Sequence, residues 1–146
     1  MAKRRRTFVL LVQRDDDERR MYAEYLTQAG WTVDVATDGE TALRRAQNAM
    51  AVITGLQLRG TMDGADLIAR LRADARTESL PIIVITAWVM PEYRARAQAA
   101  GCDRFLTKPC RPDALHLELR SLVLERVDPV PAKVPPRQLQ SRRRRR

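Results

Sequence analysis

Short apolar runs of strand length recur along the chain, and a segment with helical spacing of its apolar residues follows each one. Most runs are continuous, which is typical of strands in a parallel sheet that is buried on both faces. The run at residues 31–36 alternates, which indicates a strand nearer an edge. The expected strands are residues 7–12, 31–36, 51–54, 82–85 and 104–107. The expected helices are residues 16–29, 40–49, 63–75, 91–101 and 112–126.

Residues that favour helix ends support several of these boundaries. Asp15 or Asp16 can cap the first helix, and Gly30 is placed to end it. Pro91 fits the first turn of the fourth helix, which we expect to end at Gly101. The resulting order is βαβαβαβαβα, in which each helix crosses over between parallel strands. The pattern therefore predicts an α/β fold, a doubly wound sheet of five parallel strands with five helices.

The central stretch, residues 50–64, has an unusual end to its strand. Its apolar run stops at Gly55, a loop follows, and Met62-Asp63-Gly64 opens the next helical pattern. In an open parallel sheet, ligands and chemistry lie at the carboxyl ends of the strands. Gly55 occupies that position in a central strand and has no side chain that could react.

Charge is concentrated at the two ends of the chain. The net charge is +9, from 27 basic and 18 acidic residues, and nine of the basic residues lie in residues 3–6 and 142–146. The rest of the chain is therefore neutral (27 − 9 = 18 against 18). We expect a basic arm at residues 1–6, a domain at 7–126 and a disordered Pro/Arg-rich tail at 127–146. Nucleic acid would then bind only through the tail.

Metal and membrane chemistry have little support in the sequence. Cys102 and Cys110 match no metal-binding spacing, and His116, the single histidine, reads as a surface residue of the last helix. No stretch approaches the ~18 consecutive apolar residues of a membrane span. The N-terminal apolar run is too short for a signal peptide, so we expect a cytoplasmic protein.

Several stretches in combination resemble the receiver domain of two-component response regulators, over residues 7 to about 125. They are the FVLLV strand with acidic residues after it, AEYLTQAGWTVDVATDGETAL, MDGADLIARLRAD, LPIIVITA and AGCDRFLTKP. The resemblance implies a flavodoxin-like fold and a role in phosphorelay signalling. In such receivers an aspartate at the end of the third strand accepts a phosphoryl group from a histidine kinase, beside a Mg²⁺ held by acidic residues after the first strand.

Half of that pattern is kept in this sequence. Thr86, followed by Ala87, holds the position of the hydroxyl that binds the phosphoryl oxygens. Lys108 holds the position of the ammonium, which stabilises the charge that develops at phosphorus. Phe105 holds the position of the aromatic switch residue. The resemblance therefore implies retained switch positions at these four residues.

The other half of the pattern is missing. The phosphoacceptor position falls on Gly55, and the paired metal-binding acids fall on Gln13 and Arg14, with Asp15 matching the third acid. Arg59 stands where the family commonly has proline. Glycine cannot act as a nucleophile, and a cationic side chain repels a metal ion. We therefore expect no catalytic residue, no cofactor, and weak or absent Mg²⁺ binding, with Arg14 able to replace part of the cation's electrostatic role.

Three points stay open at this level. Making Asp15 and Asp16 the metal-binding pair would shift the first helix by two residues, which the helix pattern disfavours. Lys108 could pair with Asp15 or reach solvent, and could still drive a conformational switch. Trp88 is expected to lie half-buried against the fourth helix rather than to anchor a partner.

These observations favour a stand-alone pseudo-receiver, since no output domain follows residue 127, that acts by protein–protein contact and is not an enzyme. Its expected partner is a histidine kinase or a downstream effector, met through the fourth helix, fifth strand and last helix, and a homodimer is possible. One alternative is a receiver that accepts phosphate on a substitute such as Asp15. Another is a polyanion-binding module that uses the basic arms.

Overall fold

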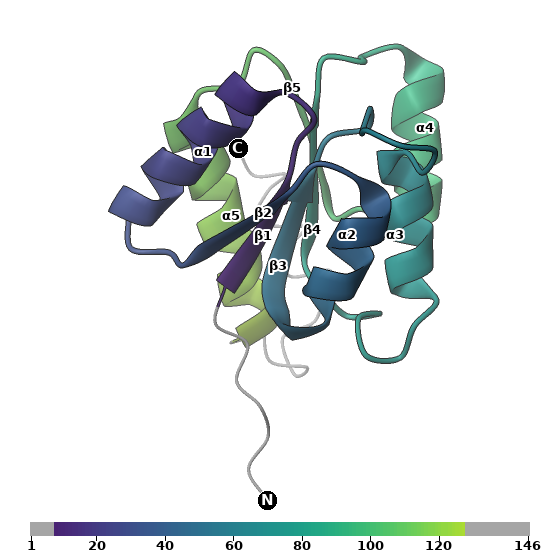
Figure 1. The fold of residues 1–146 in the computed structure, drawn as a ribbon, viewed down its shortest axis with the longest axis horizontal. Helices are drawn as coiled ribbons and strands as arrows, with labels where there is room; N and C mark the ends of the chain where they lie inside the picture. The colour runs from purple at the N-terminus through teal and green to yellow at the C-terminus, as the bar shows by residue number, and fades with distance from the viewer. Residues whose placement is uncertain (1–7, 128–146) are drawn as a thin grey trace, which may run out of the picture.

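The computed structural model describes residues 8–127, so the expected basic arm and Pro/Arg-rich tail lie outside the described residues. Strands and helices alternate through this range (Figure 1). The strands are β1 (Phe8–Val12), β2 (Val33–Ala36), β3 (Ala49–Thr54), β4 (Ile82–Thr86) and β5 (Arg104–Thr107). The helices are α1 (Asp16–Gln28), α2 (Gly39–Arg45), the 3-10 turn η1 (Ala46–Asn48), α3 (Gly64–Arg72), α4 (Pro91–Ala100) and α5 (Pro112–Val127).

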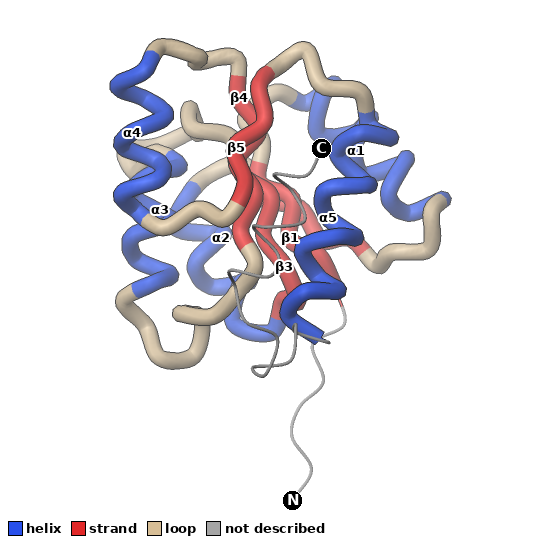
Figure 2. The backbone as a smooth tube through the Cα atoms, turned by 180° about the vertical axis from the view of Figure 1, so that it is seen from behind, coloured by secondary structure: helices blue, strands red, loops and turns tan. Residues whose placement is uncertain are grey.

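All five strands are parallel and pair in the order β2-β1-β3-β4-β5. Helices α1 and α5 cover one face of the sheet, and α2, α3 and α4 cover the other (Figure 2). This is the expected doubly wound sheet, and β2 is the edge strand that its alternating pattern predicted. Strand β3 lies at the centre, so the residue that follows it lies between the ends of β1 and β4.

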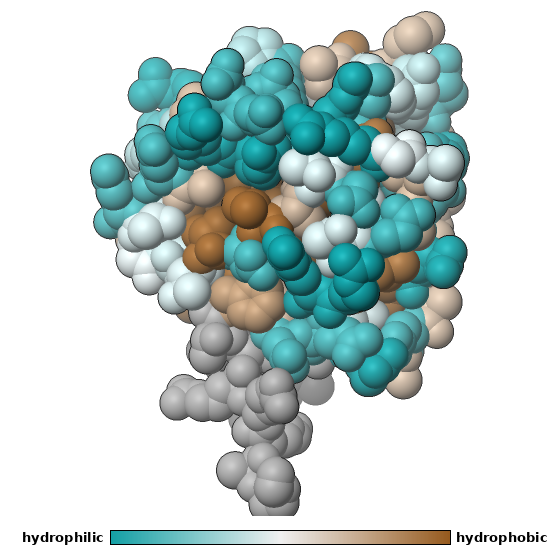
Figure 3. All heavy atoms as spheres, in the orientation of Figure 1, coloured by the Kyte–Doolittle hydropathy of each residue, from teal (hydrophilic) through white to brown (hydrophobic). Residues whose placement is uncertain are grey.

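Apolar side chains from the two faces of the sheet form two clusters, one under each helix layer. Leu67, Ile68 and Leu71 of α3 are fully or almost fully buried in one cluster, and Leu115 and Leu119 of α5 are fully buried in the other. On the outer surface, the edge strand β2 leaves apolar side chains partly exposed. Figure 3 shows an apolar patch over this strand on an otherwise mostly hydrophilic face.

The predicted helix ends are confirmed at several positions. Asp15 caps α1 by accepting a hydrogen bond from the backbone N–H of Glu18 at 2.8 Å. Gly30 follows that helix with a φ of 108°, and Gly101 ends α4 with a φ of 115°. Pro91 is the first residue of α4. Left-handed φ values strain any residue with a Cβ, which explains glycine at the two C-terminal ends.

The helix expected at residues 40–49 was wrong at its C-terminal end. Helix α2 stops at Arg45, η1 follows, and Ala49 already belongs to β3, where it pairs with Phe8. The alanines at 46 and 49 suit a helix by propensity, and no typical helix terminator, glycine or proline, lies between them. Pairing with β1 overrides that propensity and lengthens the central strand to six residues.

Gly64, the first residue of α3, fits so closely that only glycine has room. A Cβ there would lie 2.0 Å from the carbonyl oxygen of Gly55, which is far too short for two non-bonded atoms. The Gly64 N–H donates to the carbonyl of Leu56 at 2.7 Å, and Asp63 and Asp66 form a capping box around the helix start. The start of α3 is thereby fixed directly against the end of β3.

Candidate functional site

A small cavity opens at the carboxyl edge of the sheet, around the end of β3. Its volume is about 150 Å³, and Gly55 forms part of its floor. The Gly55 N–H donates to the carbonyl of Val12 at 2.9 Å, which keeps the two strand ends in register. The other principal side chains around it are Gln13, Arg14, Asp15, Glu18, Thr86, Trp88 and Lys108. The fold therefore brings together most of the candidate residues, which lie far apart in the sequence.

Gln13 is the buried polar residue of this cavity, with 2% of its surface exposed. Its Oε1 accepts a hydrogen bond from the Lys108 ammonium at 3.2 Å. Its Nε2 has no hydrogen-bond partner among residues 8–127. A Cβ added at Gly55 would lie 3.4 Å from this Nε2 and would meet no closer atom. The position of Gly55 therefore has room for a side chain, and an unpaired donor lies beside that room.

Lys108 pairs with Glu18 of α1 through a short contact between its Nζ and Oε1. Of the two possibilities left open for Lys108, pairing with Asp15 or reaching solvent, neither is the contact observed, because its ammonium is held by Gln13 and Glu18. Sequence reasoning missed Glu18, although its place one turn into the helix, three residues after the cap, carried a signal. Residues at that spacing lie on the same side of a helix. The backbone N–H of Lys108 also donates to the backbone carbonyl of Thr86 at 2.8 Å, and this hydrogen bond joins the ends of β4 and β5.

Asp16 lies on the other side of the β1–α1 turn and forms no part of the cavity wall. Its carboxylate contacts Arg19 at 2.7 Å and Arg59 at 3.0 Å. The hydrogen bond from Arg19, followed by the charge of Arg59, lowers the pKa of Asp16 below its ordinary value. Arg59 also donates to the carbonyl of Arg14 at 2.9 Å. Arg59 thus ties the β3–α3 loop to the start of α1.

Thr86 is buried at the end of β4, and its hydroxyl oxygen accepts a hydrogen bond from the backbone N–H of Trp88 at 3.0 Å. The Trp88 ring lies half-buried with its centroid 4.8 Å from that of Tyr93 on α4. This confirms the predicted packing of Trp88. Ala87, between them, is exposed at the cavity mouth.

Phe105 lies half-buried in β5, outside the cavity wall. The guanidinium carbon of Arg94 on α4 lies 4.6 Å from the centre of its ring, a cation–π geometry. The aromatic residue of β5 is thereby covered by a cation from the neighbouring helix.

The cysteines and the histidine lie apart from the cavity. Cys102 and Cys110 are free and half-buried, and burial is the main cause that raises both thiol pKa values. His116 is half-buried rather than a surface residue, because its ring packs edge-on against Tyr25 at 6.0 Å and Trp31 at 6.1 Å. Within residues 8–127, no three His, Cys, Asp or Glu side chains are placed to hold a metal ion together. In the same range, no helix is both long and apolar enough to cross a membrane.

Known proteins have sequences similar to this chain. The chain is 32% identical over 117 residues to the response regulator Rre1 of Synechocystis, covering 79% of this chain and 51% of Rre1. It is 29% identical over 119 residues to a cyclic di-GMP phosphodiesterase of Thermotoga maritima, covering 82% of this chain and 32% of that protein. The chain thus spans about half, or less, of the length of these two relatives.

Among solved structures, the chemotaxis protein CheY4 of Vibrio cholerae superposes with a TM-score of 0.74 at 28% identity, covering 80% of this chain and 98% of CheY4. The family model described as the response regulator receiver domain matches residues 9–120. That range includes all five strands except Phe8 at the start of β1, together with the cavity and the first half of α5. The chain therefore belongs to the response regulator receiver domain family.

Proposed function

We propose that this receiver domain signals by protein–protein contact, without phosphorylation of an aspartate and without tight Mg²⁺ binding. The observation that carries the proposal is Gly55 at the end of the central strand, in the floor of the cavity. An aspartyl phosphate needs a carboxylate nucleophile at the reacting position. Glycine offers none, so the chain keeps the scaffold of a two-component receiver but lacks its acceptor.

The residues around the cavity do not fit the Mg²⁺ that the family implies. A divalent cation of this kind needs several oxygen ligands, usually including carboxylates. The Gln13 oxygen is engaged by Lys108, and the Asp15 carboxylate is engaged as the cap of α1. Arg14 adds a positive charge at the same wall. The Lys108 and Arg14 side chains therefore place two protein cations where the metal ion of the family would lie.

A substitute phosphoacceptor is the competing function, and Asp15 is its candidate. Its carboxylate accepts the N–H of Glu18, and phosphorylation would remove the charge-assisted cap of α1. Asp15 also precedes α1, whereas the hydroxyl of Thr86 and the ammonium of Lys108 lie at the ends of β4 and β5. Thr86 and Lys108 would then have to bind a phosphoryl group attached to the β1–α1 turn rather than to the end of β3. This arrangement favours the first proposal.

Contacts with a histidine kinase or an effector are supported by exposed apolar side chains near α4 and on α5. Val89 and Met90 lie just before α4 and are 54% and 55% exposed. Leu117 and Leu124 project from α5 and are 63% and 55% exposed. Single exposed apolar residues are ordinary, but two helix neighbourhoods that each carry a pair supply anchors for a partner. The same exposed side chains could instead pair two copies of this chain as a homodimer, which the mass of the protein in solution would reveal.

Transfer from a ³²P-labelled small phosphodonor tests the proposal. The natural protein is expected to incorporate no label, because it lacks an acceptor carboxylate. The matched variant carries Gln13→Asp, Arg14→Asp and Gly55→Asp together and is expected to gain Mg²⁺-dependent label. Labelling of the natural protein that disappears in Asp15→Asn would establish the substitute-acceptor function instead.

A further inference from the structure

The cavity at Gly55 contains hydrogen-bond donors that signalling by protein contact leaves unused. Gln13 Nε2 is the strongest of them, because it is buried and has no partner within residues 8–127. An unsatisfied buried donor costs about 1–3 kcal/mol of stability, so native proteins keep few of them. A group that accepts this N–H would remove that cost, and Gly55 leaves the space beside it open.

Two further donors border the same space. The Lys108 ammonium lies against Gln13 Oε1 and can donate three hydrogen bonds, of which Gln13 and Glu18 take two. The Thr86 hydroxyl oxygen accepts from the Trp88 backbone N–H, and the hydroxyl proton has no acceptor among residues 8–127. An amide, an ammonium and a hydroxyl that converge on one cavity match an acceptor with several oxygens.

The acidic residues of the cavity are already engaged. Asp15 caps α1, and Glu18 is held by Lys108. Arg14 lies exposed on the same wall and adds positive charge. The Glu18 carboxylate shows that Lys108 takes an oxyanion when one is in reach, and Glu18 is partly exposed on a flexible side chain. An incoming anion can therefore share Lys108 with it or replace it.

We propose that this cavity binds a small oxyanion, a carboxylate or a phosphate, without a covalent bond. Its oxygens would accept from Gln13 Nε2, Lys108 Nζ and the Thr86 hydroxyl, in the space that a side chain at position 55 would otherwise fill. The terminal torsion of glutamine is soft, so a small rotation turns Nε2 toward the ligand. Such a site goes beyond signalling by protein contact, because it gives the domain a reversible small-molecule input.

Titration with sodium acetate and with sodium phosphate tests the proposal, with sodium chloride at matched ionic strength as the reference. Fluorescence reports binding because Trp88 lies in the cavity wall. We expect a saturable change with a Kd on the order of 1 mM for at least one of the two anions. Gln13→Met and Lys108→Met should each weaken binding by about tenfold or more, because each removes a donor to a charged group. Arg20→Met, a change of the same kind at an exposed residue of α1, should leave the Kd unchanged.

Gly55→Asp provides a second variant that does not depend on removing a buried side chain. Its tethered carboxylate would occupy the cavity, so binding of free acetate and phosphate should be lost. Absence of a saturable change beyond that of chloride, or equal affinities in all variants, would overturn the proposal. Intact mass after removal of the anion separates this site from phosphorylation: an unchanged mass is expected, whereas a retained phosphoryl group would contradict both proposals.

Discussion

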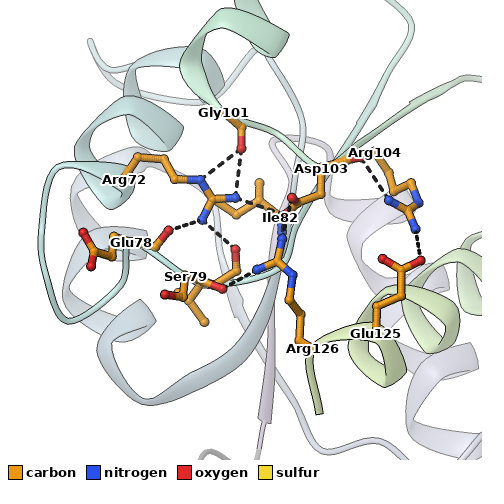
Figure 4. A network of polar contacts seen from close by, with 10 residues as sticks. Arg72, Glu78, Ser79, Ile82, Gly101, Asp103, Arg104, Glu125 and Arg126 are labelled. Atoms are coloured by element: carbon orange, nitrogen blue, oxygen red, sulfur yellow. Dashed lines mark hydrogen bonds and ion pairs between the residues drawn. The ribbon is translucent and has the colours of Figure 1, made fainter. Parts of the chain in front are cut away.

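Buried polar groups are fully hydrogen-bonded at the amino ends of the strands (the amino edge of the sheet) but not at their carboxyl ends (the carboxyl edge). At the amino edge, all five N–H groups of Arg72 donate to acceptors within the chain (Figure 4). Its acceptors are the carbonyls of Glu78, Leu80 and Gly101 and the carboxylate of Asp103. At the carboxyl edge, Gln13 leaves a buried N–H unpaired beside an open cavity.

Asp103 shows how complete the amino edge is. Its carboxylate accepts from Arg72 at 3.0 Å, from the Ile82 N–H at 2.8 Å and from Arg126 of α5. Arg126 also reaches the carbonyl of Ser79. The network thereby joins α3, β4, β5 and α5 at one point. The comparison indicates that the amino edge stabilises the fold, while the carboxyl edge keeps a costly arrangement that stability alone does not require.

The largest effect is expected from breaking the amino edge with Arg72→Met. The change leaves the carbonyls of Leu80 and Gly101 without their donor and removes one partner of Asp103. We expect the free energy of unfolding to fall by about 2–3 kcal/mol, because a partly buried ion pair loses one member and several carbonyls lose their donor. Urea unfolding measures it, with Arg70→Met at an exposed position of the same helix as the control. Equal, small losses in both variants would mean that the network contributes little.

A smaller loss of stability is expected from alanine substitutions at the two glycines of the carboxyl edge, and it should differ between them. Gly64→Ala should lower the free energy of unfolding by about 2 kcal/mol, because its Cβ would overlap the Gly55 carbonyl. Gly55→Ala should change it by less than about 1 kcal/mol, since its Cβ would meet only ordinary contacts and alanine restricts the unfolded chain. Thermal unfolding of the pair measures both. A larger loss at Gly55 would show that the cavity is less open than described.

The smallest effect is the loss of stability at high pH that comes from the Tyr22 hydroxyl, next to the carboxyl edge. The Tyr22 hydroxyl donates to the carbonyl of Cys110 at 2.8 Å, and burial raises the pKa of Tyr22 to about 12. Between the unfolded value near 10 and this folded value, the unfolded chain loses a proton that the folded protein keeps. Stability should therefore be full below pH 10 and decline as the pH rises toward 12. Urea midpoints of Tyr22→Phe should show a shallower decline, and identical slopes would contradict this assignment.

Much of the fold could be predicted from the sequence, because it depends on local patterns. The apolar runs, the cap at Asp15 and the glycines at 30 and 101 placed nearly every element. The end of α2 could not be predicted, since it depends on the pairing of Ala49 with Phe8 in another part of the chain.

The sequence predicted which residues belong to the candidate site, but not which of their side chains contact one another. Its residues were found through the resemblance to receivers, and the fold brings Gln13, Gly55, Thr86 and Lys108 to one cavity. The Lys108–Glu18 pair and the unpaired Nε2 of Gln13 depend on side chains from separate strands and helices. No spacing along the chain specifies such contacts, so only the three-dimensional arrangement revealed them.

We propose that this receiver scaffold is intact but lacks phosphoryl chemistry. Mg²⁺ titration followed by tryptophan fluorescence, with and without beryllofluoride, tests it most directly, because Trp88 borders the cavity. The natural protein should not respond to Mg²⁺ and should show no beryllofluoride response that depends on Mg²⁺. The variant with Gln13→Asp, Arg14→Asp and Gly55→Asp should respond to Mg²⁺ and, in its presence, to beryllofluoride. A response of the natural protein to Mg²⁺ and to beryllofluoride would contradict the claim and identify it as a working phosphoacceptor.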